Sequence, residues 1–208
     1  MKDTSPMPLP DPDDVLRTYE AVAQDFARAR SRALFERRWL DRALGFAPGR
    51  EVLDLGCGPG RPIASYLAER RCRMTGVDGA ASMCALYQAN VPGAVTYHED
   101  MRGLGLGRRY DLILAWDSLF HLAPDDQRGM FATFAAHARP RTVLLFTSGP
   151  DAGEVGGQAA GLPVYHASLS PDEYRGLLAQ AGFEVLDFVP EDPNCHGHTV
   201  WMARYVGG

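Results

Sequence analysis

The residues that most clearly suggest chemistry are three alternate glycines, Gly56, Gly58 and Gly60, directly after a short apolar run at Val52–Leu55. Glycine lets the backbone turn sharply and lets a ligand approach where a Cβ atom would collide. Asp78 follows Gly56 by 22 positions and ends a second apolar run. A carboxylate there can bind the ribose hydroxyls of a nucleoside. The spacing therefore predicts a site for a nucleoside-containing cofactor.

The glycine loop distinguishes between two classes of cofactor. The dinucleotide fingerprint G-x-G-x-x-G/A needs a small third residue so that the helix can pack against the strand. Read from Gly56 the third position is Arg61, and read from Gly58 it is Ile63. Pro62 also lacks the amide that a pyrophosphate would use at a helix start. The loop therefore favours a nucleoside that carries an amino acid and disfavours a nicotinamide dehydrogenase.

Four segments of the chain resemble, in order, the motifs of class I S-adenosylmethionine-dependent methyltransferases: Asp54–Gly60, Gly76–Met83, Glu99–Met101 and Asp111–Leu122. The resemblance runs from about residue 50 to the last residue. It implies S-adenosyl-L-methionine as the cofactor and S-adenosyl-L-homocysteine as the product. The cofactor contacts that it implies are Asp54, Gly56, Cys57, Gly58, Asp78, Gly79, Met83, Asp100, Met101 and Trp116.

The resemblance also assigns roles to these contacts. Asp54 lies near the amino-acid end of the cofactor, and Asp78 grips the ribose. Met83 lies near the adenine, Asp100 pairs with the adenine amino group, and the amide of Met101 serves a ring nitrogen. Each role has a structural alternative: Asp78 also suits a helix cap, Met83 a core position and Asp100 a solvated loop.

Candidate catalytic residues lie in the loop after the run at Asp111–Ala115. In an α/β sheet, ligands bind outside the carboxyl ends of the strands, where this loop must lie. Asp117 suits orienting or deprotonating an acceptor, and equally suits capping the loop. His121 titrates near neutral pH and suits a general base, although packing at the start of the next helix explains it as well. Trp116 is expected to form an apolar wall.

The first 49 residues are expected to form a helical cap over the active site, with residues 50–208 as the cofactor-binding domain. Proline alternates with polar residues over residues 1–12, which predicts no regular element there. Val15, Tyr19, Val22 and Phe26 then recur at helical spacing. Residues 34–44 form a second helical stripe, which ends before Pro48 and Gly49. On the first stripe, Tyr19 suits a contact to the cofactor's amino acid, and core packing is its alternative.

From residue 50 onward, apolar runs alternate with helical patterns, which predicts an α/β fold with a mostly parallel sheet. Strands are expected at 51–55, 73–77, 95–98, 111–115, 141–147, 183–189 and 199–206, and helices at 62–71, 81–90, 125–139 and from Ser170 to about Ala181. The last two strands are joined too closely for a crossover helix, so they should be antiparallel. With the resemblance, this implies a Rossmann-like three-layer αβα sandwich whose seven strands have the order 3-2-1-4-5-7-6, the last strand being antiparallel. Residues 153–161 are expected to be a glycine-rich loop, followed by Tyr165 and His166 as candidate acceptor contacts.

Composition excludes several other classes of protein. The 21 lysines and arginines against 26 acidic residues give a net charge of −5, which disfavours a nucleic-acid partner. No apolar run approaches the ~18 residues of a membrane helix, and the first ten residues lack the apolar core of a secretory signal. Four scattered cysteines indicate a reducing compartment, so the expected location is the cytoplasm. Cys195, His196 and His198 lack the usual zinc spacing, so no metal is expected.

The sequence therefore predicts a cytoplasmic S-adenosylmethionine-dependent methyltransferase that acts on a small-molecule acceptor, as a monomer or homodimer. Methyl transfer from a sulfonium is an in-line displacement, so the protein must mainly align the reacting atoms and exclude water. The alternative is a non-catalytic protein that retains the fold and binds the cofactor or its product.

Overall fold

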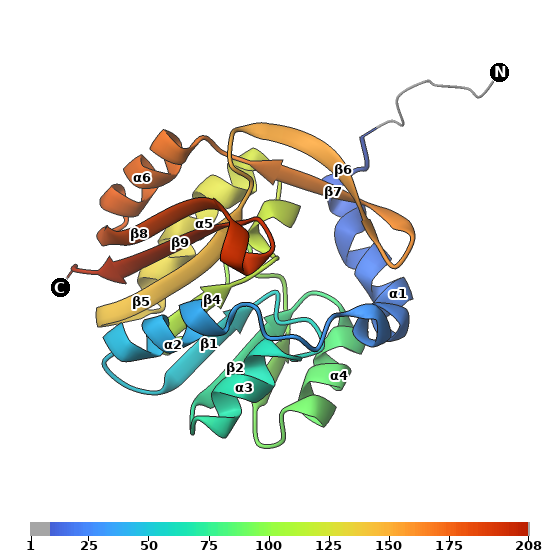
Figure 1. The fold of residues 1–208 in the computed structure, drawn as a ribbon, viewed down its shortest axis with the longest axis horizontal. Helices are drawn as coiled ribbons and strands as arrows, with labels where there is room; N and C mark the ends of the chain where they lie inside the picture. Colours follow the sequence, from blue (N-terminus) through green and yellow to red (C-terminus); the bar gives the residue numbers. More distant parts are fainter. Residues whose placement is uncertain (1–8, 208) are drawn as a thin grey trace.

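A computed structural model describes residues 9–207, so most of the predicted irregular segment 1–12 lies outside the described residues. The main sheet contains β1 (Glu51–Leu55), β2 (Arg73–Asp78), β3 (Val95–His98), β4 (Tyr110–Ala115), β5 (Ala138–Ser148), β8 (Phe183–Asp192) and β9 (His198–Tyr205). The α-helices are α1 (Val15–Ala29), α2 (Arg37–Phe46), α3 (Ile63–Glu69), α4 (Ala81–Asn90), α5 (Pro124–Ala136) and α6 (Pro171–Gln180). Helices cover both faces of the sheet (Figure 1).

The seven-stranded sheet has the predicted order, β3-β2-β1-β4-β5-β9-β8. The neighbouring pairs from β3 to β5 are parallel, and β9 runs antiparallel to both β5 and β8. All six residues of β4 are buried, because the helices on the two faces exclude water from the central strands. The predicted α/β Rossmann-like architecture, with an antiparallel last strand, is confirmed.

Two expectations about local structure are wrong. The predicted glycine-rich loop is a strand, β6 (Gly153–Ala159), which pairs antiparallel with β7 (Leu162–Ser168) in a separate two-stranded sheet. Most of β6 is exposed and rich in glycine, so its side chains carry no apolar alternation, although its backbone still pairs. The helix expected at 125–139 ends at Ala136, because Ala138 already pairs with Tyr110 of β4.

The two amino-terminal helices have different surroundings. Trp39, Leu40 and Ala43 of α2 are buried in the same core cluster as strand residues Val143 and Met202. Helix α1 instead packs against α4 and against the β6–β7 hairpin, away from the main sheet (Figure 1). The division at residue 49 remains a prediction, but of the two helices only α1 is placed as a cap would be.

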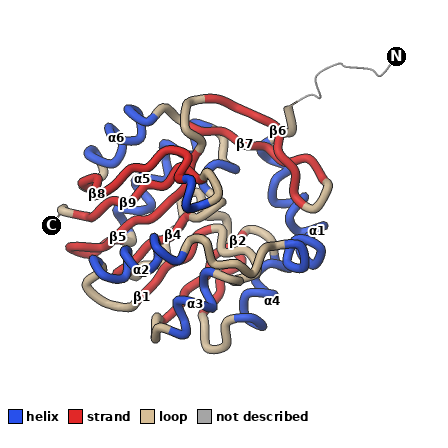
Figure 2. Tube along the Cα trace, viewed as in Figure 1, coloured by secondary structure: helices blue, strands red, loops and turns tan. Residues whose placement is uncertain are grey.

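The loops after β1, β2 and β4 converge between the sheet and α1 (Figure 2). The first and the third of these loops are in close contact. Gly56 has a φ of +65°, and a Cβ atom on it would lie 2.3 Å from the Cβ of Ser118. The Ser118 hydroxyl donates a hydrogen bond to the Leu55 carbonyl oxygen at 2.7 Å. Only glycine accommodates both the left-handed backbone and this approach.

Within residues 9–207, no helix combines the length and the apolar character that a membrane crossing requires.

We expect Gly56→Ala to lower the free energy of unfolding by about 2–4 kcal/mol, because a methyl group there meets Ser118 and strains the backbone. Urea denaturation measures this change. Gly105→Ala is the matched control, because a Cβ atom at Gly105 has no neighbour within 4 Å and the backbone there is not left-handed. Its effect should lie between zero and a gain of about 1 kcal/mol. Equal effects of the two substitutions would contradict the proposed close contact.

Candidate active site

One pocket opens at the carboxyl ends of the parallel strands, between the loops that follow them and helix α1. The predicted cofactor-binding and catalytic residues all line it: Tyr19, Asp54, Gly56, Cys57, Gly58, Asp78, Gly79, Met83, Asp100, Met101, Trp116, Asp117 and His121. The two candidate acceptor contacts, Tyr165 and His166, do not line it. The assembly of the lining residues follows from the topology, because parallel strands end at one edge of the sheet. Their roles toward a ligand remain predictions.

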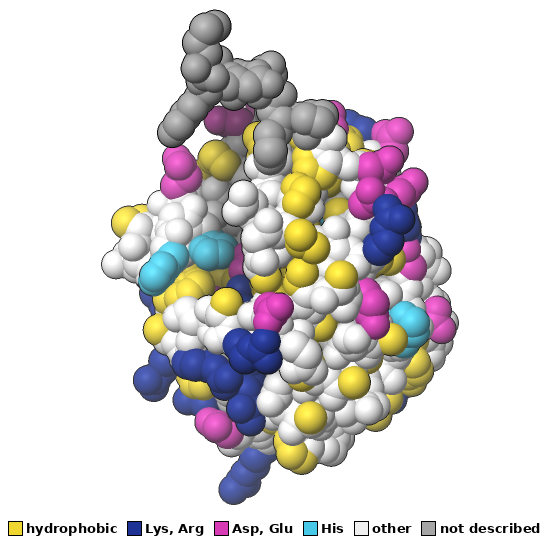
Figure 3. Space-filling model, turned by 90° about the vertical axis from the view of Figure 1, so that its right-hand side faces the viewer, with side chains coloured by type: hydrophobic (Ala, Val, Ile, Leu, Met, Phe, Trp, Pro, Cys, Tyr) yellow, Lys and Arg dark blue, Asp and Glu magenta, His cyan; other side chains and the backbone are white. Residues whose placement is uncertain are grey.

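Acidic side chains outnumber basic ones around the pocket. Six carboxylates line it, namely Asp54, Asp78, Glu99, Asp100, Asp117 and Asp126, against the three guanidinium groups of Arg30, Arg61 and Arg102. On the face shown in Figure 3, a group of basic side chains lies at the lower left, and most acidic side chains lie above and to the right, with some basic ones among them. The pocket therefore suits a ligand that carries positive charge.

Asp78 is fixed by two backbone amides. Its Oδ2 accepts a hydrogen bond from the Gly58 N–H at 2.8 Å, and its Oδ1 accepts one from the Ala80 N–H at 2.9 Å. The side chain thus joins the glycine loop to the turn before α4. It does not cap that helix, whose N-cap is Ala80 and receives no side-chain bond, so the capping alternative is wrong. Each carboxylate oxygen keeps acceptor capacity for a ligand hydroxyl. Burial raises the pKa of Asp78 despite these two bonds.

Asp54 is a buried carboxylate without an ion pair among the described residues. Its side chain accepts a hydrogen bond from the Tyr87 hydroxyl at 3.3 Å. Burial raises the pKa of Asp54 to about 7, since water no longer stabilises the charged form. A cationic group brought into the pocket would therefore be stabilised by ionised Asp54.

Tyr19 and His121 form a hydrogen-bonded pair between α1 and the loop after β4. Nε2 of His121 lies 2.9 Å from the Tyr19 hydroxyl, and Nδ1 lies 3.0 Å from the carbonyl oxygen of Tyr165. A carbonyl oxygen only accepts, so Nδ1 carries the proton and Nε2 accepts from Tyr19. Burial lowers the pKa of His121 to about 4. His121 is therefore neutral at pH 7 and able to accept a proton.

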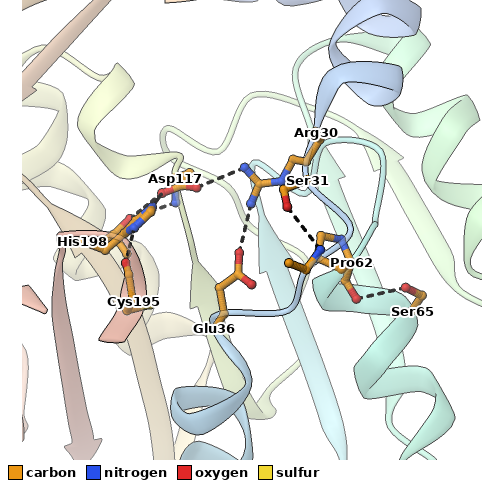
Figure 4. Close-up of polar contacts among 10 residues, drawn as sticks. Arg30, Ser31, Glu36, Pro62, Ser65, Asp117, Cys195 and His198 are labelled. Carbon is orange, nitrogen blue, oxygen red and sulfur yellow. Dashed lines mark hydrogen bonds and ion pairs between the residues drawn. The ribbon is translucent and has the colours of Figure 1, made fainter. Parts of the chain in front are cut away.

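Asp117 is held by groups from three other elements (Figure 4). Its Oδ2 lies 3.2 Å from Nη1 of Arg30, and its Oδ1 lies 3.0 Å from Nε2 of His198. Its N–H donates to the Thr147 hydroxyl at 2.9 Å. Burial opposes ionisation, but the His198 hydrogen bond and the two cations outweigh it and lower the pKa of Asp117. Asp117 is therefore an ion-paired carboxylate, which is a poor proton acceptor.

Three partners in this cluster were not predicted as site residues. Arg30 and His198 contact Asp117, and Glu36 in turn lies 3.4 Å from Nη2 of Arg30. Arg30 lies on the helical stripe of Tyr19, which is the one local signal that could have indicated it. His198 was considered only as a metal ligand. Within residues 9–207 no group of three or more His, Cys, Asp or Glu side chains is arranged to hold a metal ion.

The remaining predicted contacts also pack against protein groups. The Arg102 guanidinium grips both oxygens of Asp100, at 2.7 Å from Nη2 to Oδ2, and lowers its pKa against the effect of burial. Met83 is 1% exposed and packs against Ala23 and Ala80, as expected of a core residue. It also lines the pocket. Burial raises the pKa of the Cys57 thiol, which is typical of an inert filler.

Gly79 permits the close approach of the cap. A Cβ atom at Gly79 would lie 2.6 Å from a methyl carbon of Leu16 on α1. One turn further along α1, the Glu20 carboxylate accepts hydrogen bonds from the Ser82 hydroxyl and amide at 2.7 and 2.9 Å. The helix therefore packs closely against the loop after β2 and covers the pocket.

An open sheet with this strand order, a left-handed glycine turn after its first strand and an acid fixed after its second define a class I S-adenosylmethionine-dependent methyltransferase fold. Residues 26–187 match the methyltransferase domain family, and the chain belongs to that family.

Two curated relatives are methyltransferases. The dTDP-3-amino-3,6-dideoxy-alpha-D-glucopyranose N,N-dimethyltransferase of Streptomyces fradiae is 33% identical over 96 residues, which are 45% of this chain and 37% of that protein. The trans-aconitate 2-methyltransferase of Azoarcus sp. (strain BH72) is 29% identical over 156 residues, which are 64% of this chain and 60% of that protein. The similarity thus spans less than two thirds of either relative.

Solved structures share the fold at low sequence identity. CcbJ from Streptomyces caelestis superposes with a TM-score of 0.73 at 20% identity, covering 91% of this chain and 98% of its own. The CalS10 amino pentose methyltransferase from Micromonospora echinaspora, solved with S-adenosylmethionine, superposes with a TM-score of 0.70 at 22% identity. The match covers 90% of this chain and 96% of that chain. The 1,6-didemethyltoxoflavin-N1-methyltransferase from Burkholderia thailandensis superposes with a TM-score of 0.68 at 24% identity. The match covers 98% of this chain and 94% of that chain.

The burial of Asp54 predicts an unusual pH dependence of stability. Between about pH 4 and pH 7 the unfolded chain loses this proton while the folded protein keeps it, so the folded state becomes relatively less stable as pH rises. Across this window, Asp54→Asn should gain about 2–4 kcal/mol of unfolding free energy relative to the wild type. Urea denaturation at several pH values measures this, and Asp151→Asn in an exposed loop is the control. A constant difference between Asp54→Asn and the wild type would contradict the raised pKa.

Proposed function

We propose that the protein transfers a methyl group from S-adenosyl-L-methionine to a small-molecule acceptor by in-line displacement. The observation that carries the proposal is the pocket itself, which combines an amide-fixed carboxylate, Asp78, with an unpaired buried one, Asp54. The family and the strand order support this proposal.

The residues of the pocket fit the cofactor. Asp54 is a buried carboxylate with no cationic partner among the described residues, which suits an ammonium group. Asp78 keeps acceptor capacity for ribose hydroxyls, and Met83 and Met101 offer apolar contact to an adenine. The excess of carboxylates suits the positive sulfur. When bound, the cofactor supplies an activated methyl group whose leaving group is a neutral thioether.

The chain's own residues then position the acceptor and move its proton. The acceptor's nucleophilic atom must form its bond to the methyl carbon as the carbon–sulfur bond breaks, and any acceptor proton must leave. His121 can take that proton at Nε2, the atom that now accepts from Tyr19. Helix α1 excludes water from this space.

The acceptor class follows from the same groups. A neutral histidine can accept a hydrogen bond from an N–H group of the acceptor at Nε2, which suits a neutral amine; its pKa of about 4 is too low for it to deprotonate an ammonium group. The S. fradiae relative is named for methylating an amino sugar, which supports an amine acceptor here. The net charge of −5 supports a small acceptor over a nucleic acid. Four free cysteines support a cytoplasmic location, where the enzyme would act as a monomer or homodimer.

Calorimetric titration with S-adenosylhomocysteine tests the cofactor site. We expect the wild type to bind, and we expect Asp78→Ala to lose at least about tenfold in affinity, because hydrogen bonds to a charged group contribute about 1.5–3 kcal/mol. Asp172→Ala, 99% exposed on α6, should bind as the wild type does. Absence of binding by the wild type, or full affinity of Asp78→Ala, would contradict the proposal.

A screen of methyl transfer to small amines and hydroxy compounds tests catalysis. With a working acceptor, His121→Asn should lower kcat by about 10²–10⁴ through loss of the base. Because the pKa of His121 is about 4, protonation of this residue should lower the wild-type kcat only as pH falls toward that value. Cofactor binding without turnover on any acceptor would favour the non-catalytic alternative. The ion pairing of Asp117 also supports that alternative, because an ion-paired carboxylate is a poor proton acceptor.

A further inference from the structure

The imidazole of His198 has hydrogen-bond acceptors at both of its nitrogen atoms. Nε2 lies 3.0 Å from Oδ1 of Asp117, and Nδ1 lies 2.7 Å from the carbonyl oxygen of Cys195. A neutral imidazole has one N–H group and can donate only one of these bonds. Both bonds are formed together only by the imidazolium, so the geometry selects the charged form of His198.

Two aromatic rings lie against the same imidazole. The ring centroid of Trp116 is 5.6 Å from that of His198 with an interplanar angle of 28°, and that of Phe35 is 5.5 Å away with an angle of 33°. The face of an aromatic ring attracts a cation, and stacking also fixes the plane of the imidazole. The positive charge of His198 is therefore favoured, and its direction toward Asp117 is fixed.

Asp117 connects His198 to the carboxyl end of helix α1 (Figure 4). Its second oxygen pairs with Arg30, the residue at which α1 ends, and Arg30 also reaches Glu36. Glu36 is fully buried, and its Oε2 has no hydrogen-bond partner among the described residues. Two cations and two carboxylates from separate segments thus form one chain at the edge of the pocket. Arg30 and Asp117 line the pocket, whereas His198 does not.

We propose that His198 is a positioning residue, whose imidazolium keeps Asp117 ionised and aimed so that Arg30 holds the end of α1 over the pocket. The link to ligand binding rests on the proposed function, and the pairing itself does not. Through this chain the proton on His198 is coupled to the affinity of the pocket for its ligand, although His198 does not touch the ligand.

The coupling has a definite direction with pH. Burial alone would lower the pKa of His198, but the Asp117 carboxylate and the Cys195 carbonyl outweigh it and raise the pKa above the ordinary value. The proton is therefore present at acidic pH and lost as pH rises through this raised pKa. The charged or titratable groups that face His198 are Asp117, Glu36 and Arg30, with Cys195 and His196 in its own loop. When His198 loses its proton, Arg30 is the only cation that still pairs with Asp117. We then expect the ion-paired chain to fix the end of α1 less firmly.

Imidazole NMR titration of the full chain tests the pairing directly. We expect the His198 signal to titrate above the ordinary histidine pKa in the wild type, and at a lower pKa in Asp117→Asn. A His198 pKa at or below the ordinary value, or one that Asp117→Asn leaves unchanged, would overturn the proposal. This experiment needs neither cofactor nor acceptor, so its result is independent of the proposed function.

Calorimetric titration with S-adenosylhomocysteine at pH 6 to 9 tests the coupling. Asp54 ionises in the same pH range in both proteins, so the effect of His198 is measured as the affinity of the wild type relative to His198→Gln. We expect the wild type to bind about tenfold more tightly than His198→Gln at pH 6, and this advantage to be lost as pH rises, within the usual range of coupling between two sites. His196→Asn is the matched control at an exposed histidine two residues before His198, and it should keep the wild-type profile.

The possible outcomes of this titration are distinct. A wild-type advantage over His198→Gln that is absent at pH 6 or constant with pH, or one that His196→Asn also loses, would overturn the assignment of the coupling to His198. If His198→Gln does not fold by circular dichroism, the NMR titration of the wild type and Asp117→Asn still decides. No binding by the wild type at any pH would contradict the proposed function and this coupling, and would leave the NMR result on the pairing unaffected.

Discussion

The close approach of Gly56 to Ser118 is the constraint on which the pocket depends. The two residues lie in the loops after adjacent parallel strands, β1 and β4, and the Ser118 hydroxyl donates a hydrogen bond to the last carbonyl of β1. No side chain larger than that of glycine fits between them, so the loop after β1 must turn away toward Asp78. The Gly58 amide then donates a hydrogen bond to the Asp78 carboxylate, which connects the ends of β1 and β2 beside the pocket. One missing Cβ atom therefore determines how three strand ends are arranged.

Four of the six carboxylates around the pocket fall into two groups with different surroundings. Asp54 and Asp78 are buried and bonded only to neutral donors, so burial raises the pKa of each. Asp100 and Asp117 pair with arginine or histidine, which lowers their pKa values. The first group retains attraction for an external cation, whereas the second is already neutralised within the protein. The same residue type thus differs in charge state within one pocket, according to whether a basic side chain lies beside it.

Sequence reasoning succeeded where the signal is local. Gly56 and Asp78 each follow an apolar run, and the parallel topology alone brings such strand ends to one edge. It failed where partners come from distant segments. His198 meets Asp117 only because β9 inserts beside β5, and Thr147 of β5 in turn holds the backbone of Asp117. The β6 strand was missed because an exposed, glycine-rich strand has no alternation, although its hydrogen bonds do not need side chains.

The contact between the hairpin and His121 involves the main chain of Tyr165 and not its side chain. Any amino acid at that position supplies the same carbonyl oxygen, so the tautomer of His121 does not depend on the identity of the residue. The hairpin also forms its own small sheet, separate from the seven strands that carry the core. Substitutions along its exposed positions can therefore accumulate without loss of this hydrogen bond or of the fold. The orientation of His121 is thus set by backbone geometry, which tolerates sequence change in the hairpin during evolution.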